Sequence, residues 1–233
     1  DADSEGIEGK YYTFSYNELK KIKDIEKYYE IDPKGNWEGK IILKEKKLAP
    51  ENITEELKSI RNKRIKPFFD NKTQLDLNCI LISAFVKAHE ILPQNQYLKS
   101  AQNIYKAIEN KFENFQIYHS NSKNISFLED YAYLINASLD LADASLEMKY
   151  RLSANQLMED AIKKFYIKEK NIFQKNQILT NDIFCEPIDI SDHTISNGNS
   201  IMLTNFSRLG MLDEAKKLAD SLTGYLNIYK NYM

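Results

Sequence analysis

Residues 75–85 read LDLNCILISAF, and this run is apolar on nearly every side of a helix. The next helical run, YLKSAQNIY at residues 97–105, has apolar side chains on one face only. A helix that is apolar all round is buried on both sides, whereas an amphipathic helix keeps one face in water. The contrast therefore predicts an inner helix that is followed by an outer helix.

The same contrast recurs twice further along the chain. Helical runs are expected at residues 75–91, 97–112, 127–144, 148–165, 196–209 and 211–227. Hairpins that pair an inner with an outer helix are typical of an α-solenoid or of a toroid of αα-hairpins. We therefore expect a mainly α fold, an α/α-toroid (six-hairpin-like) fragment of about three to four helical hairpins, with small β-hairpins at the rim.

Residues 1–66 lack this rhythm and are expected to form a leading β/α segment ahead of three helical hairpins in residues 67–233. Ser15 and Glu18 have the spacing of a capping box, which predicts a helix that runs to about Tyr29. Strands are expected at residues 10–14 and 37–43, and a charged helix at residues 50–64.

Residues 166–190 interrupt the helical repeat. Residues 166–168 and 171–174 alternate like two short strands joined by a turn, and residues 178–183 extend this pattern. We expect a β-hairpin at the rim of the toroid.

The composition of the 233 residues limits the possible partners. The formal net charge is -2, with basic and acidic residues interleaved, so neither nucleic acid nor an anionic membrane is favoured. No apolar run approaches the ~18 residues of a membrane span, and a cytoplasmic location is expected. Cys79 and Cys185 do not make a disulfide framework, and buried free thiols are favoured over a bridge.

Three polar stretches lie just ahead of the inner helices, or open them. They are residues 70–72, 126–131 and 191–200. In a hairpin repeat every second helix points the same way, so the N-termini of the inner helices lie on one face. Helix N-termini present unpaired N–H groups and a positive dipole end, which suit anionic or hydroxyl-rich ligands. We therefore expect the three stretches to meet on one rim.

Each stretch also has a purely structural explanation. Asp70, Asn71, Ser126 and Ser196 are all residue types that cap helices. Glu129 and Asp130 fall in a first helical turn, where carboxylates are favourable, although paired carboxylates also act as general acid and base.

The three histidines differ in their surroundings. His193 lies in a polar loop and is the best titrating candidate, His89 is expected in the core, and His119 is expected in solvent. The spacing of histidines and cysteines predicts no metal site, and no cofactor motif is present.

Four segments resemble the YyaL family, whose members are related to the spermatogenesis-associated thioredoxin-like protein of animals. DADSEGIEGKYY at residues 1–12 and FLEDYAYLI at residues 127–135 resemble two of its signatures. Two more are matched by residues 70–72 with Asn78, and by Asp192 with residues 198–200. The four segments occur in the same order and with the same spacing as in the family, from residue 1 to about residue 210.

This resemblance implies an α/α toroid similar to N-acylglucosamine 2-epimerases and cellobiose epimerases. Full-length members carry a preceding thioredoxin-like domain, so the chain is expected to be the C-terminal part, about half a toroid. The sequence departs from the family pattern at Leu77, Cys79, His193, Ser196 and Asn197. The family has Trp at the position of Leu77, and the loss of an aromatic ring that would stack on a sugar weakens a carbohydrate function.

Two functions therefore stay open. The departures favour a non-catalytic or regulatory binding module that works with a thioredoxin-like half, and the alternative is a carbohydrate-active toroid. The catalytic candidates are His193, Glu129 and Asp130. The binding candidates are Asp1, Asp3, Ser4, Glu5, Asp70, Asn71, Lys72, Asn78, Tyr131, Asp192, Gly198, Asn199 and Ser200. A sugar-like ligand is expected, and so is the missing N-terminal half or self-association, because half a toroid exposes apolar edges.

Overall fold

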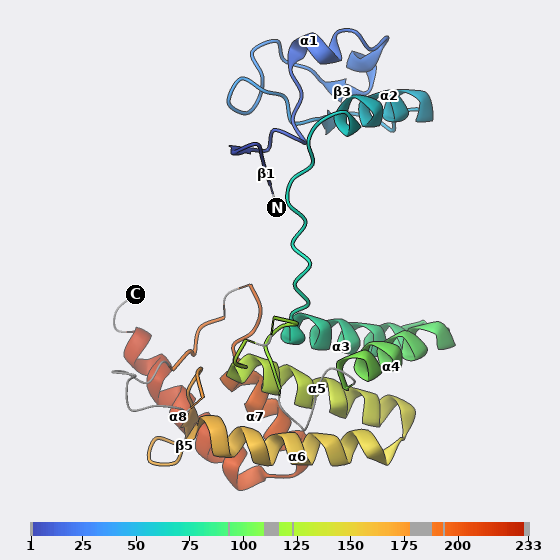
Figure 1. Cartoon of the computed structure of the whole chain (residues 1–233). Helices are drawn as coiled ribbons and strands as arrows, with labels where there is room; N and C mark the ends of the chain where they lie inside the picture. Colours follow the sequence, from blue (N-terminus) through green and yellow to red (C-terminus); the bar gives the residue numbers. More distant parts are fainter. Residues whose placement is uncertain are drawn as a thin grey trace. The chain divides into compact units, whose positions relative to one another are not determined.

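The computed structural model describes residues 2–92, 94–109, 117–122, 124–177, 188–192 and 194–230. The chain divides into two compact units, Asp1–Asn71 and Lys72–Met233. Figure 1 shows the first unit in blue to teal and the helical hairpins of the second in green to red.

The first unit is built from short elements around its own apolar core. These are β1 (Asp3–Ser4), β2 (Ile7–Glu8), α1 (Tyr16–Leu19), η1 (Ile25–Lys27), β3 (Tyr29–Glu30), β4 (Lys44–Glu45) and α2 (Glu51–Asn62). Antiparallel pairs join β1 to β2 and β3 to β4. The core consists of Phe14, Leu19, Ile22, Ile25, Ile41, Ile53 and Leu57.

The Ser15–Glu18 capping box is present, but the helix it opens ends at Leu19 rather than near Tyr29. Asp24 has a φ of 63°, which belongs to the left-handed region, so an α-helix cannot continue through this residue. The two strands expected at residues 10–14 and 37–43 meet only at a Phe14–Ile41 bridge.

The described part of the second unit contains three helical hairpins. They are α3 (Leu75–Ile91) with α4 (Asn95–Glu109), α5 (Leu128–Ser145) with α6 (Met148–Phe165), and α7 (Gly198–Leu209) with α8 (Leu212–Lys230). α5 packs between α3 and α7, and each of these three also packs against its own hairpin partner. The predicted mainly α hairpin repeat is therefore confirmed.

A small β-hairpin follows α6, as the alternation of residues 166–174 predicts. β5 (Tyr166–Ile167) pairs with β6 (Ile172–Phe173) in antiparallel fashion. Phe173 is fully buried beside Phe206 of α7, so the hairpin is anchored to the helices by its aromatic side chains. The expected extension over residues 178–183 lies outside the described residues.

Candidate functional site: the helix N-termini of the second unit

The first turns of α3, α5 and α7 are joined by polar contacts between their ends. Gln74, just before α3, contacts His119, and His119 contacts Asp130 of α5. On the other side of α5, the Tyr133 hydroxyl donates to the Ser196 carbonyl just before α7. We call this region the mouth: Gln74, Asp76, His119, Glu129, Asp130, Tyr133, Asp192, Ser196 and Asn197.

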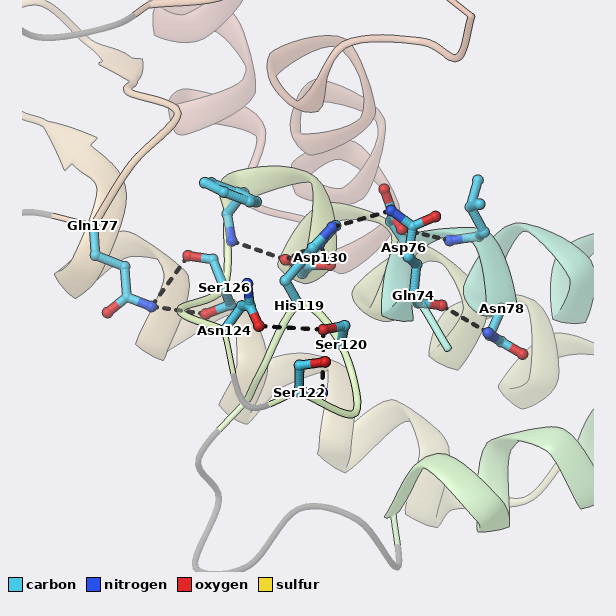
Figure 2. A network of polar contacts seen from close by, with 12 residues as sticks. Gln74, Asp76, Asn78, His119, Ser120, Ser122, Asn124, Ser126, Asp130 and Gln177 are labelled. Carbon is cyan, nitrogen blue, oxygen red and sulfur yellow. Dashed lines mark hydrogen bonds and ion pairs between the residues drawn. The ribbon is translucent and has the colours of Figure 1, made fainter. Parts of the chain in front are cut away.

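His119 lies at the centre of the polar network in Figure 2. Its Nδ1 lies 3.0 Å from Oδ1 and 3.1 Å from Oδ2 of Asp130, and its Nε2 lies 3.3 Å from the Gln74 amide nitrogen. With the Gln74 amide donating to Nε2, the neutral ring that carries its proton on Nδ1 satisfies both contacts. The expectation of a solvated His119 is therefore wrong, since its side chain is only 20% exposed.

Asp130 is fully buried in the first turn of α5. Burial raises the pKa of this carboxyl to about 6, although the Phe127 N–H and His119 both favour the charged form. The Phe127 N–H donates to Oδ2, so the side chain also caps the helix. Among the described residues, the hydrogen bonds of the Asp130 carboxylate go to His119 and to the Phe127 N–H, which suits an orienting role better than direct contact with a ligand.

Glu129 points to a different side of α5, because consecutive helical residues are ~100° apart. Burial raises the pKa of its carboxyl. The charge of Asp189 also raises this pKa, whereas Lys175 and the Gly198 backbone lower it. Its Oε2 is buried and has no hydrogen-bond partner among the described residues. Glu129 is therefore a desolvated carboxyl with one free acceptor position.

Tyr133 shows that several acidic groups face the mouth. Burial raises the pKa of its hydroxyl, and so do the negative charges of Asp192, Asp76 and Glu129. These carboxylates come from α3, from α5 and from the loop before α7. The mouth is therefore acidic.

Much of the 191–200 stretch caps α7. The Asn197 side chain accepts from the Ser200 N–H, and Asp192 Oδ1 accepts from both the N–H and the side-chain amide of Asn197. Ser200 Oγ accepts from the same amide group. Asp192 and Ser200 thus position Asn197, while His193 lies outside the described residues.

Gly198 and Asn199 have packing roles. A Cβ on Gly198 would lie 2.8 Å from Cγ and Cδ2 of Leu128, so only glycine permits this approach of α7 to α5. Asn199 is buried, and its side chain pairs with both the N–H and the carbonyl of Phe173. These two binding candidates hold helices and the β-hairpin together.

Two further binding candidates, Tyr131 and Asn78, form hydrogen bonds to neighbouring parts of the second unit. The Tyr131 ring is fully buried, and its hydroxyl contacts Asp160 and Lys164 of α6. Asn78 of α3 donates to the carbonyl of Gln74, which lies just before that helix. Tyr131 therefore joins an inner to an outer helix.

The remaining binding candidates belong to the first unit or adjoin its boundary. Ser4 donates to the Ile65 carbonyl and Glu5 pairs with Lys10, so both act within the first unit, as does Asp3 in β1. Asp70 and Asn71 end that unit and Lys72 opens the next. Asp1 lies outside the described residues.

One acidic cluster has the composition of a cation site. Asp76, His119 and Asp130 each offer a ligand atom, and these atoms lie within 4.8 Å of one another. Sequence spacing could not predict this cluster, because its members come from three separate segments. Both ring nitrogens of His119 are already engaged, so an ion could bind His119 only by displacing Gln74 or Asp130.

Cys79 lies beneath this cluster as a buried free thiol, as expected. Burial raises its pKa, and so do the charges of Asp130 and Asp76. A thiol of this kind is unreactive. Cys185 lies outside the described residues.

Within the described part of the chain, none of the helices has the length and apolar character needed to span a bilayer. No protein-family model matches the sequence, and no curated protein matches it.

The fold of the second unit is similar to that of α/α-toroid enzymes. A GH76 α-mannanase from Bacteroides thetaiotaomicron matches with a TM-score of 0.54 at 13% identity, over 68% of this chain and 46% of that one. A variant of the GH76A α-1,6-mannanase from Salegentibacter, in complex with α-1,6-mannotriose, matches with a TM-score of 0.55 at 15% identity, over 74% and 54%. Cellobiose 2-epimerase from Bacillus thermoamylovorans matches with a TM-score of 0.51 at 16% identity, over 70% and 46%.

The chain thus spans about half the length of the solved structures it matches. At these identities the likeness establishes the α/α-toroid fold of the matched region.

Proposed function

We propose that the mouth is part of a carbohydrate-active site that transfers protons to or from a sugar. The observation that carries this proposal is the placement of two consecutive carboxyl residues, Glu129 and Asp130, at the opening of an inner helix. One carboxyl has a free buried oxygen and the other orients a histidine. The fold's solved neighbours include both mannanases and an epimerase, and all of these act on sugars.

Asp130 would hold His119 in position while Nε2 of His119 exchanges a proton with the ligand. A buried carboxylate that accepts from one ring nitrogen fixes the tautomer and leaves the other nitrogen for chemistry. Gln74 would have to release Nε2 when the ligand binds. General acid–base groups of this kind contribute typically ~10²–10⁴-fold to a rate.

Glu129 would act as the second acid or base. Burial raises its pKa, which brings a carboxyl closer to the working pH of an enzyme. An inactive form of the Salegentibacter mannanase has two consecutive aspartates replaced. The consecutive Glu129 and Asp130 are the feature of this chain most comparable with that pair.

The resemblance to the YyaL family keeps a binding or regulatory module as a second candidate. Its supporting observation is the burial of Asp130, whose carboxylate contacts the Phe127 N–H and His119. A binding module would retain sugar affinity without turnover, and one experiment distinguishes the two.

The experiment measures the melting temperature and product formation of the chain with α-1,6-mannotriose and with cellobiose. A ligand at 100 times its Kd stabilises the folded state by ~2.7 kcal/mol. Turnover that Glu129→Gln and His119→Asn each abolish supports the enzyme. A shift in melting temperature without turnover supports the binding module. The absence of both effects would sink the carbohydrate proposal.

Asp213→Asn is the matched control. Asp213 is also a carboxylate in the first turn of a helix, but it lies exposed on the outer helix α8. The Asp213→Asn substitution should leave both the melting temperature and product formation unchanged.

A further inference from the structure

Three side chains at the mouth lie close together although they come from three separate segments. Asp76 belongs to the first turn of α3, His119 to the segment before α5, and Asp130 to the first turn of α5. Each offers one possible ligand atom, and these atoms lie within 4.8 Å of one another. Figure 2 shows the three residues within one polar network. We call them the Asp–His–Asp cluster.

The two carboxylates of this cluster are buried. Asp76 is 8% exposed and Asp130 is 0% exposed. Buried carboxylates are normally paired with a cationic side chain or bound to a metal ion. Among the described residues, neither carboxylate forms an ion pair with lysine or arginine, and the basic group that contacts Asp130 is the imidazole of His119.

The helix N-termini compensate only part of the negative charge. Each carboxylate lies in a first helical turn, where the macrodipole supplies the equivalent of roughly half a positive charge. Two ionised carboxylates beside a neutral His119 therefore retain about one uncompensated negative charge. A bound cation would offset this charge.

Asp76 also has an oxygen without a hydrogen-bond partner. Its Oδ1 accepts from the Leu77 N–H at 2.8 Å, whereas Oδ2 forms no hydrogen bond with any described residue. A carboxylate that is 8% exposed keeps little contact with water, so leaving an acceptor unused is costly. This unused acceptor is the observation that points to a ligand, because a carboxylate that served only to cap a helix would not be directed at His119 and Asp130 as well.

Neighbouring groups already orient the other two members of the cluster. The Phe127 N–H donates to Oδ2 of Asp130, and Gln74 contacts Nε2 of His119. Metal-binding residues typically have such outer partners, which fix the direction of each ligand. Oδ1 of Asp130 lies 3.0 Å from Nδ1 of His119, which is close to the separation of two ligands on one Zn²⁺ ion with bonds of ~2.0–2.2 Å.

We propose that the Asp–His–Asp cluster binds Zn²⁺ through one carboxylate oxygen of Asp76, one of Asp130, and Nδ1 of His119. The ion replaces the Nδ1 proton, which moves to Nε2, and Asp130 changes from hydrogen-bond acceptor to ligand. The Gln74 amide then turns so that its oxygen accepts from the Nε2–H. Three protein ligands leave the fourth tetrahedral position to water.

The ligand types select the ion. An imidazole nitrogen suits Zn²⁺, whereas Mg²⁺ and Ca²⁺ prefer oxygen ligands alone. The side chain of His119 is 20% exposed, so an ion can reach the cluster from solvent. This binding goes beyond the proposed sugar chemistry and needs no sugar.

The test is a calorimetric titration of the whole chain with Zn²⁺ at one fixed pH, after a chelator has removed bound metal. The expected result is one Zn²⁺ per chain and weaker binding of Mg²⁺ and Ca²⁺. Asp76→Asn should weaken Zn²⁺ binding by at least about tenfold, while its amide oxygen can still accept from the Leu77 N–H. Asp213→Asn is the matched control and should keep the parent affinity, since that carboxylate lies exposed in the first turn of α8. Circular dichroism verifies that each variant is folded.

Co²⁺ in place of Zn²⁺ identifies the ligand types. Nitrogen and oxygen ligands give no thiolate-to-cobalt charge-transfer band, whereas binding by Cys79 or Cys185 would produce one. The proposal is overturned by this band, by a lack of Zn²⁺ binding, by an unchanged affinity in Asp76→Asn, or by a preference for Ca²⁺ over Zn²⁺. Because these measurements contain no sugar, their failure is distinct from a failure of the proposed function.

Discussion

Nδ1 of His119 lies 3.0 Å from Oδ1 of Asp130, and this pair ties the segment before α5 to the first turn of that helix. The two residues also link the packing of the inner helices to the proposed site. The same carboxylate caps α5, faces α3 and orients the histidine.

Asp130 should make the stability of the protein depend on pH. Its pKa is about 6 in the folded chain and 3.8 in the unfolded reference. As pH rises, the unfolded state therefore loses this proton at a lower pH than the folded state does. The free energy of unfolding contributed by the neutral Asp130 carboxyl is fully present below about pH 4, and it is lost as the pH rises through about 6. The change should amount to about 2–3 kcal/mol. Denaturant unfolding at several pH values measures it.

In Asp130→Asn, the dependence between pH 4 and 6 should flatten relative to the parent chain. An unchanged slope in this variant would show that another group is responsible. Asp213→Asn serves as the exposed control and should retain the parent slope.

Gly198→Ala should destabilise the second unit by about 1–3 kcal/mol, because the added methyl overpacks the contact with Leu128. The double variant with Leu128→Ala should lose less than the sum of the two single variants, since the smaller side chain makes room. Thermal or urea unfolding supplies the three values. Strict additivity would contradict the close approach.

Asn199→Ala should cost about 2–4 kcal/mol, because it leaves both backbone groups of buried Phe173 without their partners. Hydrogen exchange should also show loss of protection at the Phe173 amide. Thr223→Ala is the control, since that exposed hydroxyl bonds only within its own helix. If Asn199→Ala behaved like the control, the clamp between α7 and β6 would be refuted.

Tyr131→Phe should lower stability by about 0.5–1.5 kcal/mol and leave sugar binding unaltered, because the hydroxyl contacts α6 rather than the mouth. Calorimetry with α-1,6-mannotriose, compared for the variant and the parent, checks the second part. A loss of affinity without a loss of stability would restore Tyr131 as a ligand contact.

The hairpin repeat could be predicted from the sequence because burial leaves a periodic signal. The all-round apolar run at residues 75–85 and the amphipathic run after it correspond to α3 and α4, and the bounds of the six helices agree closely. Local rules also located the Ser15–Glu18 capping box and the β5–β6 hairpin. In the first unit the helical spacing of Ile22 and Ile25 predicted too long a helix, because both side chains join the core although α1 ends at Leu19.

The site could be predicted only in part. Topology alone indicated that residues 126–131 and 191–200 would approach one another, since inner helices point the same way. The sequence could not predict the direction of each side chain. Glu129, Asp130 and Tyr131 are consecutive, yet Glu129 lies near Lys175 and Asp189, Asp130 contacts His119, and Tyr131 contacts α6.

The sequence by itself determined the inner and outer helices, because each helix carries its own burial pattern in its period. Only the tertiary structure decided that His119, expected in solvent, lies against Asp130 and Gln74. That contact joins residues from three separate segments. The period of apolar residues within a helix shows which face is buried, but it does not show which distant side chains will be buried against one another.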